Sequence, residues 1–372
     1  MEQQEFVNNV HEFIKIISLY LHHEKAHHIV IDKSKLSFFL RFAKSHSLRA
    51  LLYKAIKETG CKIDKEDIDK LEEYYLFNIR KSMLFERDRE ALYNYLNKNE
   101  IEFLPLKGLV INKFYPDQFI REYADYDIMF EGSGKPIREF CVNHGYEVKL
   151  YEKSNHDVYI KKPFYNFEMH RELFAGREDL KIFIPYFKNY LKNAPVKQGH
   201  EHYLKLEDFY IYFTAHSHKH YAISGCGVRT LVDYYIFTKR NELDFAYINK
   251  ELEKLELLEF SNKIINLSNK LFDNEPLNDE EEEMLLYIAS SGTYGTMEHR
   301  VNKALENRGK FSYFMSRVFP PMEVYRVRYP WAYKTKVLIP IAWFLRLLQG
   351  ATVDHKKAKS ELHYIRKHKK DN

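Results

Sequence analysis

Apolar and polar residues follow different periods along the chain. In residues 1–98 the apolar side chains recur at helical spacing, which predicts an N-terminal helical region. Residues 99–175 contain short alternating runs, which are typical of strands. Helical spacing returns in residues 176–319, and residues 320–372 form a segment rich in proline, aromatic and basic residues. The pattern predicts an α+β fold, with a small mixed sheet between two helical regions.

The middle region divides into short elements, and a long helix precedes it from about Lys70 to Lys98, with Asp64 or Asp67 as its cap. Gly145 is expected to end the second helix of the region. The predicted elements are strand 101–106, helix 109–115, strand 125–131, helix 135–144, and strands 146–151, 156–161 and 165–170.

Candidate chemistry begins at the sequence Asp125-Tyr126-Asp127, which leads into an apolar run. Alternate side chains of a strand share a face, so the two carboxylates would stand roughly 7 Å apart at the backbone. Two such groups repel unless a cation lies between them. Hard cations such as Mg²⁺ take carboxylate ligands and leave positions open for phosphate oxygens.

A third carboxylate is predicted on a later strand. In the run 166–170, Phe167 and Met169 would face one side, and Glu168 and His170 the other. His170 could contact a phosphate or a base, or support Glu168 as a neutral imidazole. His156 and Tyr159 are expected to line the same cleft.

These motifs carry a resemblance. The sequence LPLKG at 104–108, the YPD turn at 115–117, Arg121 and the Asp125–Asp127 pair resemble the uncharacterised nucleotidyltransferase family of the polymerase-β-type superfamily. The resemblance implies a polymerase-β-type core in which a glycine turn holds the triphosphate. It also implies that Asp125, Asp127 and Glu168 are catalytic and bind two metal ions, Mg²⁺ or alternatively Mn²⁺.

The turn differs from the wider superfamily, which usually has Gly-Gly or Gly-Ser there. This chain has Lys107-Gly108-Leu109, so no hydroxyl is available for a phosphate. The nucleotide phosphates would then be held by backbone N–H groups around Gly108, by Lys107 or by Arg121, with His170 nearby.

A histidine-rich stretch lies in the second helical region. His216 and His220 share a helical face with no accompanying acid, which argues against zinc. The segment from His216 to Phe237 resembles the family's H…H…G-x-G-x-R-x-L-x-D pattern. By that resemblance His216, His220, Arg229 and Asp233 would face the nucleotide or the acceptor. Alternatively, Arg229 and Asp233 stand at i,i+4 and pair with each other.

Composition adds limits. The 372 residues carry a net charge of +5, which does not demand a nucleic-acid partner. The three cysteines show no paired spacing and the N-terminus has no signal pattern, so a cytoplasmic protein is expected. The apolar run 337–348 is too short to span a bilayer. We expect it to pack across the other domains; contact with a membrane interface is the alternative.

Together these features predict a metal-dependent nucleotidyltransferase. It would move a nucleoside monophosphate from an NTP to a hydroxyl or phosphate of a small molecule, sugar or peptide and release pyrophosphate. Two alternatives stay open, a transferase that modifies a protein or tRNA and a non-catalytic nucleotide-binding scaffold. The sequence names neither the nucleotide nor the acceptor.

Overall fold

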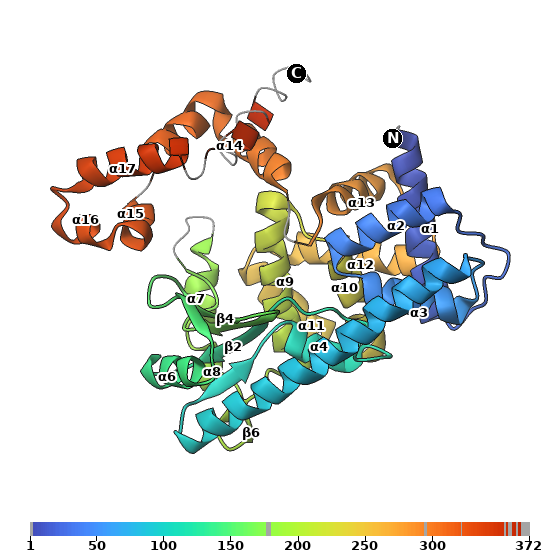
Figure 1. Ribbon diagram of the computed structural model, residues 1–372, viewed down its shortest axis with the longest axis horizontal. Helices are drawn as coiled ribbons and strands as arrows, with labels where there is room; N and C mark the ends of the chain where they lie inside the picture. Colours follow the sequence, from blue (N-terminus) through green and yellow to red (C-terminus); the bar gives the residue numbers. More distant parts are fainter. Residues whose placement is uncertain are drawn as a thin grey trace.

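The computed structural model describes residues 3–175, 180–293, 296–320, 322–352, 355, 359–361 and 364–365. Helices surround a seven-stranded mixed sheet (Figure 1), whose strand order is β3-β4-β5-β2-β1-β7-β6. The α+β class is therefore confirmed. The strands are β1 Phe103–Pro105, β2 Tyr126–Phe130, β3 Glu147–Leu150, β4 His156–Lys161, β5 Tyr165–His170, β6 Val196–Gln198 and β7 Glu201–His202.

The five strands predicted in the middle region are all present, and β4 and β5 have the predicted bounds. The sequence pattern missed β6 and β7, which lie in the stretch expected to be helical. They are only three and two residues long, too short for alternation to be visible. β7 pairs in parallel with β1, where Phe103 lies opposite Glu201.

The helix predicted at 135–144 is present at Lys135–Asn143. The long helix predicted from about Lys70 begins at Lys65, with Asp64 at its N-cap position but without a side-chain cap hydrogen bond. Gly145, with a φ of +79°, follows the second helix of the middle region as expected. The helices are α1 Gln3–Leu21, α2 Lys33–His46, α3 Arg49–Thr59, α4 Lys65–Lys98, α5 Gly108–Ile111 followed by the 3-10 turn η1 Asn112–Phe114, α6 Lys135–Asn143, α7 Phe183–Phe187, α8 Tyr190–Asn193, α9 Leu206–Ser224, α10 Val228–Arg240, α11 Phe245–Lys254, α12 Leu258–Phe272, α13 Asp279–Ser291, α14 Met297–Val318, α15 Met322–Arg328, α16 Pro330–Thr335 and α17 Ile339–Thr352.

One face of the sheet packs on α4 and α6 through a mainly aromatic core. Phe85 of α4 stacks on Tyr126 of β2 with ring centroids 3.7 Å apart, and it meets Phe167 of β5 edge-on at 5.3 Å. Because side chains alternate along a strand, the residues between these aromatic rings must face the other way. That opposite face carries the candidate chemistry.

A second, larger core joins the N-terminal helices to α9, α10, α12 and α13. It includes Phe13 of α1, Leu51 of α3, Phe209 of α9 and Met129 of β2. Residues before and after the sheet in sequence therefore share one apolar interior. This core places α9 and α10 across the face of the sheet that α4 does not cover.

The C-terminal helices lie apart from the sheet and are joined to the body through α14 (Figure 1). The buried side chains of α15–α17 form a small cluster of their own around Tyr325, Ala332 and Ala342. The expectation that the apolar run 337–348 packs across the other domains is therefore not met. No described helix is both long and apolar enough to cross a membrane.

Candidate functional site

The pairing of β2 with β5 brings two predicted acids together. The strands run parallel, with Asp127 opposite Glu168 and Met129 opposite His170. Partners in register point to the same side of a sheet, so Asp127 and Glu168 share the face turned away from α4. His170, two residues after Glu168, lies on that face as well.

Asp127 lies at the centre of the polar contacts. Its Oδ1 lies 2.6 Å from Nζ of Lys107 and 2.8 Å from Nε2 of His170. Nε2 of His170 lies 3.9 Å from Glu168, and Nε2 of His156 lies 3.8 Å from the same carboxylate. One ligand atom each from Asp127, Glu168 and His170 all fall within 4.8 Å of one another.

The charges in this group are unbalanced. Although burial acts to raise the pKa of Asp127, Lys107 and His170 hold it well below its usual range. Burial, together with the Asp127 and Asp125 carboxylates, raises the pKa of Glu168 to about 7. Burial and Asp127 also raise the pKa of Asp125. Lys107 pairs directly with Asp127, while Arg229 and Arg121 act on Asp125 from farther away. Three carboxylates that crowd together in this way suit a hard divalent ion.

The residues present fit a divalent cation, with one change from the predicted ligand set. Asp125 lies just before β2 rather than within it, and it lines the same cavity without belonging to the tight group. His170 takes the third place beside Asp127 and Glu168. Its second ring nitrogen, Nδ1, is buried and has no hydrogen-bond partner.

A cavity of about 330 Å³ opens over these side chains between the sheet and α9–α10. It brings together every predicted site residue except one. It also contains Phe213, Ser217, Lys219 and Thr293, which sequence reasoning did not select. The predicted residues that line it are Lys107, Gly108, Arg121, Asp125, Asp127, His156, Glu168, His170, His216, His220, Arg229 and Asp233.

Tyr159 is the exception, and the expectation that it lines the cleft is wrong. Its ring is fully buried in the aromatic core against α4 and α6, where Tyr159 lies opposite Phe167. His156 and Tyr159 are three residues apart on β4, so their side chains must point to opposite faces. That odd separation was visible in the sequence.

The turn at Lys107-Gly108, which follows β1, has an unusual backbone. Lys107 has φ +47° and ψ −117°, a conformation that glycine adopts freely and other residues rarely do. Lysine holds this conformation while its ammonium pairs with Asp127. A Cβ on Gly108 would lie 2.5 Å from Nη1 of Arg121, so the close approach of this guanidinium requires glycine there.

Arg121 is held by Asp233 of α10. Its Nε and Nη2 donate to the two carboxylate oxygens at 2.8 and 2.9 Å, and Tyr115 donates to Oδ1 at 2.7 Å. Both charged side chains are at least nine-tenths buried. Asp233 thus pairs across the fold with Arg121, and its expected i,i+4 partner Arg229 donates instead to the carbonyl of Glu122 at 2.9 Å.

The helices α9 and α10 and the turn between them form the wall of the cavity opposite the sheet. Gly225 has φ +87°, and a Cβ on Gly227 would lie 2.8 Å from the backbone of Thr293, which explains both glycines. On α9, Nε2 of His216 lies 3.2 Å from Nε2 of His220. Burial, with Lys107 nearby, holds the pKa of His216 well below its usual value, so this wall presents a neutral imidazole.

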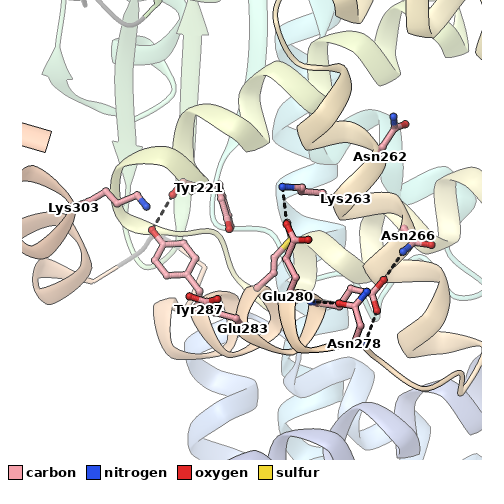
Figure 2. Close-up of a pocket in the computed structure, with 11 residues that line it drawn as sticks. Tyr221, Asn262, Lys263, Asn266, Asn278, Glu280, Glu283, Tyr287 and Lys303 are labelled. Atoms are coloured by element: carbon pink, nitrogen blue, oxygen red, sulfur yellow. Dashed lines mark hydrogen bonds and ion pairs between the residues drawn. The ribbon is translucent and has the colours of Figure 1, made fainter. Parts of the chain in front are cut away.

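A larger cavity of about 710 Å³ lies elsewhere, between α12 and α13 (Figure 2). Its polar side chains are occupied with one another. Lys263 pairs with Glu280 at 2.7 Å, and Glu281 closes a capping box with Asn278 at the start of α13. These contacts fasten one helix to another. Glu280, Glu281 and Glu283 line this cavity, but among the described residues they do not form a group of close ligand atoms like that of Asp127, Glu168 and His170, so we assign the chemistry to the smaller cavity.

Comparison with known proteins identifies the family of the chain. Residues 32–273 match the family described as uncharacterised nucleotidyltransferase, which covers more than half of the chain and all of the sheet strands. No curated protein and no solved structure matches the chain. The chain belongs to the uncharacterised nucleotidyltransferase family.

Proposed function

We propose that the protein is a metal-dependent nucleotidyltransferase that uses the cavity over β2 and β5. Family membership supports nucleotidyl transfer as the class of activity. The observation that carries the proposal is the pairing of Asp127 with Glu168 on parallel strands, with three ligand atoms within 4.8 Å. A bound Mg²⁺ or Mn²⁺ would supply a Lewis acid for the α-phosphate and the pyrophosphate leaving group.

The roles of the residues follow from their positions. Asp127, Glu168 and His170 would hold the divalent ion, and Asp125 lies beside them in the same cavity. Glu168, whose pKa is raised to about 7, is also placed to accept a proton from the acceptor hydroxyl. That value belongs to the metal-free site; a bound divalent ion would keep the Glu168 carboxylate ionised, as a metal ligand and a general base both require.

Positive charge for the phosphates comes from the turn. Lys107 is near enough to exchange Asp127 for a phosphate oxygen, and Nη1 of Arg121 is held against Gly108 by the ion pair with Asp233. Arg121 acts here as a positioned charge, since Nε and Nη2 are already occupied. Arg229, His216 and His220 form the wall that would meet the base or the acceptor.

The acceptor is a hydroxyl or a phosphate of a small molecule, sugar or peptide in this proposal. The alternatives are a protein or tRNA acceptor and a nucleotide-binding scaffold without turnover. Pyrophosphate release would distinguish both transferase hypotheses from the scaffold hypothesis, and the mass of the product would identify the class of acceptor.

The test uses the full chain with Mg²⁺ or Mn²⁺, each of the four NTPs and candidate acceptors, read by pyrophosphate release and mass spectrometry. Asp127→Asn is expected to lower release by at least roughly 1000-fold, because it removes a charged ligand. Glu147→Gln is the matched control, since Glu147 lies on β3 of the same sheet and is exposed. Unchanged release in Asp127→Asn would refute the metal assignment.

A further inference from the structure

The outward face of α17 is apolar. Ile341, Phe344 and Leu348 follow the spacing i, i+3 and i+7, so they share one side of the helix, and Val337 lies in the turn just before it. All four are exposed, Phe344 by 56% and Leu348 by 46%. A surface helix normally turns such a stripe inward, and here it faces solvent.

The inward face explains this orientation. Nε1 of Trp343 donates to the carbonyl of Val318 at 2.8 Å, and its ring stacks on Phe319 with centroids 5.6 Å apart. Arg346 donates to the carbonyl of Arg317 at 2.7 Å. These contacts fasten α17 to the end of α14, so the apolar stripe cannot turn inward without breaking them.

The charge of this segment is one-sided. Residues 324–353 contain no aspartate or glutamate, and their basic residues are Arg326, Arg328, Lys334, Lys336 and Arg346. Arg328, Lys334 and Lys336 are exposed, as is the large aromatic side chain of Trp331.

Another exposed apolar stretch, on α4 at Leu76, Phe77, Met83 and Leu84, differs in this respect. Acids such as Glu73 and Glu86 lie close to it in the same helix. Within α15–α17 the sequence has one acid, Glu323 at the start of α15, against five basic residues, so this unit combines apolar exposure with a large excess of positive charge.

We infer that α15–α17 is a docking surface for an anionic lipid bilayer, with the outward stripe of α17 in the interface and the basic side chains among the headgroups. Apolar burial and attraction to anionic headgroups act together in such helices. A second copy of the chain would present the same positive charge and repel. The orientation leaves the helix lying on the bilayer, in keeping with its 14-residue length.

The chain provides its own reporter. Its two tryptophans, Trp331 and Trp343, both lie in this unit. The full protein is mixed with phosphatidylcholine vesicles with and without about 30% phosphatidylserine. We expect co-sedimentation and a blue shift of tryptophan emission only with the anionic vesicles. Both should weaken when salt rises from about 0.1 to 0.5 M.

Paired variants make the test decisive. Phe344→Ser with Leu348→Ser should lower the partition coefficient at least roughly tenfold. Lys334→Gln with Lys336→Gln should lower it by roughly 25-fold at low salt, at about fivefold for each lost charge. The control is Val142→Ser with Lys149→Gln, an exposed apolar and an exposed basic residue on α6 and β3, which should leave binding unchanged.

Several outcomes would overturn the inference. They are the absence of binding to anionic vesicles, equal binding to neutral vesicles, and an equal loss of binding in the control variant. A dimer in sedimentation analysis that Phe344→Ser with Leu348→Ser dissociates, without vesicle binding, would reassign the stripe to self-association. The measurements do not depend on nucleotidyl transfer, so failure of this inference and failure of the proposed function can be told apart.

Discussion

At β2 and β5 the sheet carries aromatic side chains on one face and charged side chains on the other. Tyr126 and Phe167 are packed against Phe85 of α4, where burial and ring contacts stabilise the fold. One residue along each strand, Asp127 and Glu168 crowd together on the opposite face. The comparison teaches that the packed aromatic face holds together carboxylates that would otherwise move apart. Removing a ring from the aromatic face should therefore lower the stability of the fold, whereas neutralising the crowded Glu168 should raise it.

The largest expected effect is on the aromatic face. Phe167→Ala removes a fully buried ring and should lower the free energy of unfolding by about 3–5 kcal/mol. Denaturant titration measures it. The control is Phe77→Ala on α4, where half of the side chain is exposed and the cost should be within about 1 kcal/mol. A loss for Phe167→Ala no larger than the control's would contradict the assigned core.

An intermediate effect is expected where the charged face meets α10. Asp233→Asn leaves the buried Arg121 guanidinium without its anion and should cost about 3 kcal/mol of unfolding free energy. The exposed pair between Lys263 and Glu259 gives the control, since Glu259→Gln should cost less than about 1 kcal/mol. Equal stabilities of the two variants would show that Arg121 does not rely on Asp233.

The smallest effect has the opposite sign. The pKa of Glu168 is raised to about 7 from an ordinary value of 4.5, so its contribution to stability is complete below pH 4.5 and is lost as the pH rises through 7. Glu168→Gln removes that loss. In EDTA at pH 8 the variant should therefore be more stable than the wild type by roughly 1–3 kcal/mol, with the difference vanishing near pH 4.5.

Unfolding curves from pH 4.5 to 8 check this, with Glu147→Gln on β3 as a control that should show no pH-dependent difference. Added Mn²⁺ should raise the melting temperature of the wild type and have little effect on Glu168→Gln, because ligand binding to the folded state stabilises it. A variant that is less stable than the wild type at pH 8 in EDTA would mean that Lys107 already satisfies Glu168.

The local elements could be predicted because their signals are local. Alternation in 165–170 assigned Phe167 and Glu168 to opposite faces, as the structure has them. The same rule applied to β4 would have excluded Tyr159 from the cleft. His46 is the last residue of α2. It is also buried, with Nε2 3.0 Å from the carbonyl of Ala289 on α13, a contact that no local pattern indicates.

The sequence by itself determined the α+β class, the order of the first five strands and the identity of the acids, because period, turn residues and motif spacing are written along the chain. Only the tertiary structure decided which groups meet. It placed His170 rather than Asp125 in the group with Asp127 and Glu168. It also paired Asp233 with Arg121 rather than with Arg229, and it turned the apolar stripe of α17 outward. The physical reason is that register between distant strands and competition for a buried charge are settled by packing across the whole molecule, where no single segment contains both partners.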